Sequence, residues 1–151
     1  MENLAIVAFI IFILILINGF FSSSEIAIIS ARRSVIEKLK KDGNISASLV
    51  SEMKDNPEGF LATIQIGVTV VGTLASVIGG IAAIEFLKPV FASIPVGFIK
   101  NSAEFISIVV VVAVISYVTL VIGELVPKSI AIRYAEKIAC ASAMPLDLLS
   151  K

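Results

Sequence analysis

Two carboxylates, Glu25 and Glu124, lie within or at the edge of long apolar segments of the sequence. A charged carboxylate at the centre of a membrane helix costs roughly 2.5–3.5 kcal/mol on insertion scales, so its presence needs a reason. One interpretation is structural: each carboxylate lies at the headgroup level, with Arg32 or Lys128 as its partner. The other interpretation is that the carboxylates help to bind a cation inside the membrane.

The surroundings of Glu124 favour a cation site. Gly123 precedes it and Pro127 follows three residues later. Pro127 has no N–H to donate to the carbonyl four residues earlier, which is that of Gly123. Irregular backbone at membrane depth is tolerated where protein buries it or where it lines a wet cavity. The sequence therefore places a freed carbonyl oxygen next to a carboxylate.

The run Ser22–Ser24 adds three hydroxyl groups just before Glu25. Hydroxyls in membrane helices often bond back to the carbonyl four residues earlier and merely bend the helix. Together with the freed carbonyl and the carboxylate, however, they make a set of oxygen ligands, which hard cations such as Mg²⁺ prefer. Both interpretations of the serines stay open from the sequence.

The composition excludes several other chemistries. The chain has no His and a single cysteine, Cys140, which excludes His-based zinc ligation, a Ser-His-Asp triad and an internal disulfide. No nucleophile–base pair or cofactor fingerprint is present, so we expect no enzyme. Twelve basic and twelve acidic residues balance without a nucleic-acid-binding pattern, so we expect no nucleic-acid partner.

The elements that must position these groups are membrane helices. The chain is 58% hydrophobic, and the apolar residues fall into three blocks, at about residues 4–31, 60–86 and 105–126. Each block can cross a hydrocarbon layer of about 30 Å at about 1.5 Å per residue. The acidic start, Met1-Glu2-Asn3, argues against a signal peptide. We predict an all-α membrane protein in a lipid bilayer.

Short helices are predicted outside the spans. Residues 32–41 are basic and amphipathic, a turn follows at 42–44, and residues 46–54 predict a second short helix. Residues 88–104 predict a loop, and residues 129–151 an amphipathic juxtamembrane helix along the membrane surface. Basic residues are concentrated in 32–58 and in the tail. The positive-inside rule therefore predicts an external N-terminus and a cytoplasmic C-terminus in the cell membrane.

The second span carries two rows of small and polar residues at helical spacing. Steps of three and four place Gln65, Thr69, Gly72, Ser76 and Gly80 on one face. Ala75, Gly79 and Ala83 form another row, which would let two helix backbones approach closely. Helix packing and a polar lining both explain the pattern.

Three segments of the sequence stand out as motifs: Asn18–Ala27 followed by Arg32-Arg33, then Phe60–Gly67, and then Gly123–Ala131. They resemble, in this order, the first-span motif, the second-span opening and the third-span Gly-Glu-x-x-Pro-Lys signature of one family, the CorC/cyclin M (CNNM) transmembrane domain. The motifs occur in the family's order and cover essentially the whole chain.

The resemblance implies a homodimeric domain of three spans that exports Mg²⁺, in many members coupled to Na⁺ entry. Carried over by position, the ion site would use a serine of the first span, a polar group of the second, and a carbonyl and carboxylate of the third. These are Ser22 or Ser23, a group near Thr69, and Gly123 with Glu124. This agrees with the oxygen-ligand argument.

The chain departs from the family pattern in two respects. Many members have Asn after the second-span glycine, whereas Gly67 is followed by Val68, so Thr69 or Gln65 would have to substitute for the amide. Family members also continue into a cytoplasmic CBS pair and a further small domain. These are absent from the present sequence, and we expect it to be a truncated part of a longer protein.

The favoured hypothesis is an Mg²⁺ efflux domain in which Gly19, Gly123 and Pro127 are flexible points for alternating access. Glu25 stays open as a second Mg²⁺ ligand, part of a Na⁺ site or an interfacial charge. The alternative is a membrane anchor or sensor without transport, which positions cytoplasmic domains.

Overall fold

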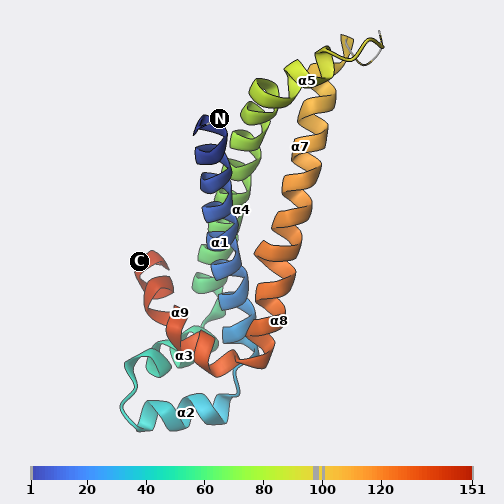
Figure 1. Ribbon diagram of the computed structural model, residues 1–151. Helices are drawn as coiled ribbons and strands as arrows, with labels where there is room; N and C mark the ends of the chain where they lie inside the picture. Colours follow the sequence, from blue (N-terminus) through green and yellow to red (C-terminus); the bar gives the residue numbers. More distant parts are fainter. Residues whose placement is uncertain (1, 97–98, 100, 151) are drawn as a thin grey trace.

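The computed structural model describes residues 2–96, 99 and 101–150, with side-chain exposure from residue 4 on. Its regular elements within these residues are all helices (Figure 1). Three are long and apolar enough to cross a membrane: Leu4–Ser30, Pro57–Ala92 and Ala103–Arg133. This confirms the predicted three-span, all-α membrane fold. Two basic residues, Lys100 and Lys151, lie outside the described residues.

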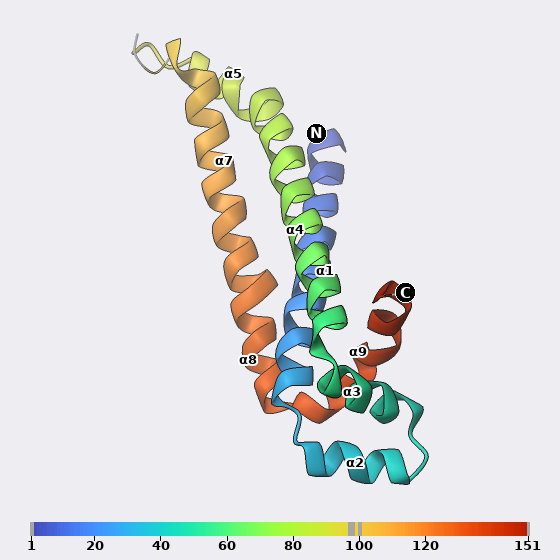
Figure 2. The same ribbon diagram turned by 180° about the vertical axis from the view of Figure 1, so that it is seen from behind.

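The three spans divide into the following segments. The first is α1 (Glu2–Ser30); the second is α4 (Pro57–Ala82), η1 (Ala83–Leu87) and α5 (Lys88–Ala92); the third is α7 (Ala103–Leu120), η2 (Val121–Leu125) and α8 (Val126–Arg133). Figures 1 and 2 show α1 and α4 side by side, while α7 diverges from α1 toward the end that carries α5. The first and third spans therefore meet closely only around η2 and α8.

Both π-helical turns, η1 and η2, precede a proline by two residues. Pro89 and Pro127 lack an N–H, so the carbonyls of Glu85 and Gly123 lose their α-helical partners. In each turn a backbone N–H instead donates to the carbonyl five residues earlier: Lys88 N to Ala83 O, and Val126 N to Val121 O. Proline thus explains why both spans change pitch without ending.

Three shorter helices lie at the end of the bundle where α1 stops: α2 (Arg33–Lys41), α3 (Ile45–Asp55) and α9 (Ala135–Ser150). The predicted turn between α2 and α3 is confirmed. Gly43 has a φ of +85°, and the Asn44 side chain caps α3 by accepting from Ala47 N at 3.0 Å. Glycine adopts this backbone region without the clash of a side chain, and Asn is a preferred N-cap residue.

The tail differs from the single surface helix predicted over 129–151. Its first part continues the third span as α8, the helix breaks at Tyr134, and α9 turns back toward α1 and α3 (Figure 1). Ala135, Ala139 and Ala143 are almost fully buried and belong to the same apolar core as α1 and α3. Small side chains let α9 pack closely, and this burial outweighs exposure along a surface.

The core lies at this end and not midway along the spans. Its largest fully buried apolar side chains are Ile28, Ile36, Val50 and Leu146, one each from α1, α2, α3 and α9. Along the spans many large apolar residues are exposed, Phe9 by 63% among them. Such surfaces are stable only in hydrocarbon, as expected for a chain with three membrane spans.

Candidate functional site

The first and third spans meet at a hydrogen bond between Asn18 and Gly123. Asn18 Nδ2 donates to Gly123 O over 2.9 Å, and Asn18 is only 4% exposed. A Cβ on Gly123 would lie 3.2 Å from Asn18 Nδ2 and 3.3 Å from Ile15 O. The glycine therefore allows α1 to approach the carbonyl that Pro127 deprives of its helical partner.

Gly19 provides the matching space on α1. A Cβ at Gly19 would lie 3.1 Å from Pro127 Cγ, so the proline ring packs directly on the glycine. The two glycines that the sequence singled out thus lie at the same helix interface, Gly19 against Pro127 and Gly123 against Asn18 and Ile15. In this structure they permit close packing of the two spans.

The three serines of the first span differ in their hydrogen bonding. Ser23 Oγ and Ser24 Oγ both donate to Phe20 O, at 3.0 and 2.6 Å. Ser22 is 3% exposed, and its hydroxyl has no partner within the described part of the chain. The local back-bonding interpretation therefore holds for Ser23 and Ser24, whereas Ser22 keeps an unused oxygen.

Ser22 lies one helical turn from Asn18 on the same face of α1. One other buried side-chain oxygen among the described residues is without a partner, that of Thr119 on α7. Thr119 precedes Gly123 by four residues, which places it one turn along the third span. Asn18 and Thr119 were not assigned a role from the sequence. The signal was present, because Asn18 is the first residue of the first-span motif and Thr119 is a polar residue one helical turn from Gly123.

Glu124 forms an ion pair on its own helix. Lys128 Nζ lies 2.7 Å from Glu124 Oε1, and the two side chains are 30% and 42% exposed, respectively. Lys128 is therefore the partner that was expected if Glu124 is a charge at the headgroup level. Glu25 is half-buried, without a hydrogen bond or ion pair within the described residues.

The second-span candidates do not join this contact within one chain. Gln65 and Thr69 are exposed, and Thr69 Oγ1 donates to Gln65 O over 2.8 Å. The opposite row is the packing face: Ala75 and Gly79 are buried, and a Cβ on Gly79 would overlap the Ile115 side chain of α7. The polar row therefore faces away from α1, and the small row packs on the third span.

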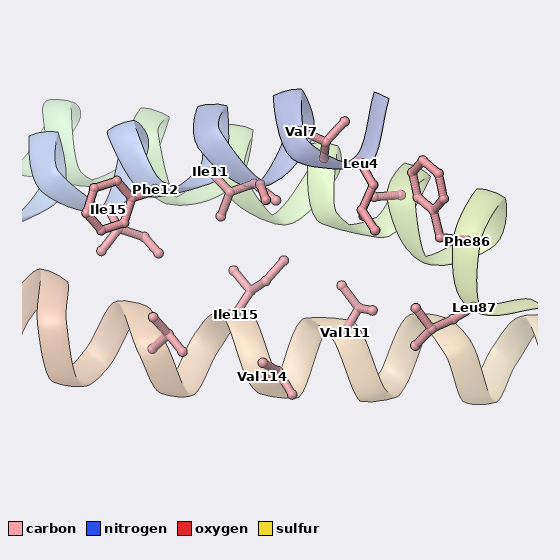
Figure 3. A pocket seen from close by; sticks show the side chains of 13 residues that line it. Leu4, Val7, Ile11, Phe12, Ile15, Phe86, Leu87, Val111, Val114 and Ile115 are labelled. Carbon is pink, nitrogen blue, oxygen red and sulfur yellow. The ribbon is translucent and has the colours of Figure 1, made fainter. Parts of the chain in front are cut away.

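A cavity of about 330 Å³ lies between the spans on the side of η1 (Figure 3). Its lining is apolar and comes from α1, η1 and α7, with Ile11, Phe86 and Ile115 among its residues. It offers a cation no side-chain oxygen. Across the described residues no group of three or more His, Cys, Asp or Glu side chains could hold a metal. A cation site among the described residues would therefore contain at most two such side chains and take its other ligands from hydroxyl, amide or carbonyl oxygens.

An ion pair ties the end of α1 to α9. Arg32 Nε donates to Glu136 Oε1 over 2.8 Å. The hydrogen bond from Arg32 is the first cause that holds the pKa of Glu136 below its ordinary value of 4.5. Because Arg32 pairs with Glu136, it is not the partner of Glu25 that the sequence suggested.

Comparison with known proteins places these features in context. Residues 9–151 match the family model of the cyclin M transmembrane N-terminal domain. The chain is 41% identical over 143 residues to the UPF0053 protein sll0260 of Synechocystis, covering 95% of this chain and 32% of that protein. It is 34% identical over 136 residues to the UPF0053 protein YhdT of Bacillus subtilis, covering 90% of this chain and 29% of that protein.

A shorter match joins the chain to a protein with a named activity. It is 39% identical over 74 residues to the polyamine export protein of Salmonella typhimurium, covering 49% of this chain and 17% of that protein. The chain spans about a third or less of the length of each of these relatives.

Proposed function

The chain belongs to the cyclin M transmembrane domain family, and on that premise we propose that it is the membrane-spanning part of an Mg²⁺ exporter driven by Na⁺ entry. In this proposal Mg²⁺ is the transported substrate. It is bound between the first and third spans by oxygen atoms, since hard divalent cations prefer such ligands.

The observation that carries the proposal is the polar contact between α1 and η2. The carbonyl of Gly123 has lost its helical partner, and the hydroxyl of Ser22 is buried without one. Buried polar groups are normally satisfied, so an unused oxygen one helical turn from Asn18, which contacts η2, supports a role in binding. Glu124, next to Gly123, supplies the negative charge.

Two rearrangements complete the site. The Glu124 carboxylate has to leave Lys128, and the Asn18 amide has to yield Gly123 O or share it, since a carbonyl has two lone pairs. In this scheme both changes occur by side-chain rotation and by motion at η2, where the helix is already irregular. Gly19, Gly123 and Pro127 are the hinge in this scheme.

A second copy of the chain is the proposed partner of the exposed polar row on α4. Thr69, Gln65 and Ser76 are exposed and face away from the other two spans, and an exposed polar row is costly in lipid. A homodimer in which this face packs on the first and third spans of the second copy would bury the row and bring Thr69 or Gln65 to the site of that copy. The basic residues at the α2–α3 end support a cytoplasmic location for that end and for the C-terminus.

The test is thermal unfolding of the purified chain in detergent during an Mg²⁺ titration. A ligand that binds only the folded state stabilises it by about 2.7 kcal/mol at a hundredfold excess over Kd. Glu124→Gln is expected to abolish the saturable stabilisation, whereas Glu58→Gln, at an exposed carboxylate of α4, leaves it intact. Flux into liposomes with and without a Na⁺ gradient then tests coupling.

Failure to bind would contradict the exporter proposal. If folded, dimeric chain shows no stabilisation by Mg²⁺, the anchor or sensor function without transport is favoured.

A second candidate substrate is a polyamine. The observation that favours it is the Lys128 ammonium, which already pairs with Glu124 at 2.7 Å and shows that the carboxylate accepts an alkylammonium group. A relative that matches about half of the chain is named a polyamine export protein. Stabilisation by spermidine at concentrations where Mg²⁺ has no effect would select this candidate.

A further inference from the structure

A small cavity lies at the junction of α1, α3 and α4, at the end of the bundle that carries the short helices. Its volume is about 210 Å³, and it is lined by Ile28, Ile29, Arg33, Lys54, Pro57 and Phe60. The first apolar span ends at Ser30 and the second begins at Pro57. The cavity therefore lies where the apolar spans meet the polar segment, which is the depth of the lipid headgroups.

Two cationic side chains, Arg33 and Lys54, line this cavity, and only one of them has an acidic partner within the described residues. Lys54 Nζ donates to the last carbonyls of α1, Ile28 O at 2.8 Å and Ile29 O at 3.0 Å. Arg33 forms an ion pair with Asp55. One positive charge is therefore left over.

Lys54 is held in a position that disfavours its charge. Burial lowers the pKa of Lys54, and the positive charge of Arg33 lowers it further. Neutral carbonyls do not compensate the ammonium as an anion would. An anionic group in the cavity would relieve both effects.

We propose that this cavity binds the phosphate of an anionic membrane lipid, with Lys54 and Arg33 as its cationic partners. The charge of the cavity is complementary to such a phosphate. Its flank is apolar, and Ile29 is 54% exposed beside it, which suits an acyl chain rather than water. A freely dissolved anion would gain no favourable contact with this apolar flank. The proposal concerns a lipid site and does not depend on which ion the chain transports.

The consequence for the fold is a lipid-dependent connection between the first two spans. Lys54 links α3 to the end of α1, and α4 begins three residues later in the chain. A phosphate bound by Lys54 and Arg33 would therefore join the last turn of α1, the first turn of α2 and the end of α3. Anionic lipid is expected to hold these three elements together at the membrane surface.

The test is lipid retention by the purified chain in native mass spectrometry, with phosphatidylglycerol compared with phosphatidylcholine of the same acyl chains. The expected result is about fivefold greater retention of phosphatidylglycerol for each cation that contributes. The double variant Arg33→Gln/Lys54→Gln is expected to lose this preference. The matched double variant Lys38→Gln/Lys41→Gln removes two exposed charges of α2 and is expected to keep it.

Lys54→Gln also removes the hydrogen bonds to α1, so Arg33→Gln alone is measured in parallel on protein shown to be helical by circular dichroism. It is expected to reduce the preference without loss of structure. Equal retention of the two lipids by the unaltered chain would overturn the proposal. Equal loss of preference in both double variants would do so too. Release of the lipid by millimolar inorganic phosphate would assign the cavity to a soluble anion instead.

Discussion

Pro127 packs on Gly19: a Cβ at Gly19 would lie 3.1 Å from Pro127 Cγ. The proline that frees the Gly123 carbonyl is thus also the residue that sets the distance between the first and third spans. The glycine has no side chain that could separate them. Local backbone chemistry and helix packing therefore depend on the same two residues.

Enlarging Gly19 is expected to separate these spans. Gly19→Val should lower the free energy of unfolding by about 1–3 kcal/mol, the usual cost of overpacking, because a Cβ alone would lie 3.1 Å from Pro127 Cγ and valine adds two methyl groups beyond it. Gly72→Val is the matched control, since nothing lies within 4 Å of a Cβ at Gly72. Thermal unfolding in detergent measures both. Equal destabilisation would show that the Gly19 contact does not set the packing.

Removing the Asn18 amide should leave the Gly123 carbonyl buried and unpaired. Asn18→Leu is expected to cost about 1–3 kcal/mol of unfolding free energy, the penalty for an unsatisfied buried polar group. The exposed Asn101→Leu should change stability little. If Mg²⁺ takes the freed carbonyl, saturating Mg²⁺ should recover part of the loss. An Asn18→Leu chain as stable as the unaltered one would contradict the importance of this bond.

Ser22 and Ser24 are expected to respond differently to alanine. Ser22→Ala removes a hydroxyl without a partner, so the ion-free chain should be as stable or slightly more stable, while stabilisation by Mg²⁺ falls. Ser24→Ala removes a hydroxyl bonded to Phe20 O and should leave Mg²⁺ stabilisation unchanged. An Mg²⁺ titration followed by thermal unfolding separates the two. Identical responses would remove Ser22 from the proposed site.

Lys128 is expected to compete with the transported cation for Glu124. Lys128→Gln should raise the apparent affinity for Mg²⁺ about fivefold, because an ion pair of this exposure is worth up to about 1 kcal/mol. Lys137→Gln, at an exposed position of α9, controls for the general loss of one positive charge. Equal affinity gains in both variants would point to long-range electrostatics rather than to displacement of Lys128.

The Arg32–Glu136 pair predicts acid sensitivity at the junction of α1 and α9. Because the pKa of Glu136 is held below its ordinary value of 4.5, the folded state binds fewer protons than the unfolded state in this range. The stabilisation is present above about pH 4.5 and is lost as the pH falls through the lowered pKa. Thermal unfolding across this range should show a smaller pH dependence for Glu136→Gln. The exposed Glu52→Gln is the control and should retain the full dependence.

Features that depend on a few neighbouring residues could be predicted from the sequence. The three spans follow from the length of the apolar blocks, and the turn at Gly43 follows from the Asp-Gly-Asn run. Loss of the helical partner at Gly123 follows from Pro127, because the residue four positions after Gly123 would donate the helical hydrogen bond and proline has no N–H. The family motifs are likewise local. In each case the cause lies within one or two helical turns.

Tertiary structure alone decided which group meets which. Three serines are equivalent in the sequence, yet only packing leaves the hydroxyl of Ser22 buried without a partner. Thr69 shares its helix with the buried Ala75 but faces away from α1. The freed carbonyl of Gly123 is satisfied by Asn18, 105 positions away in the chain. Such pairings depend on how whole helices rotate and approach one another, and a local sequence pattern does not fix that geometry.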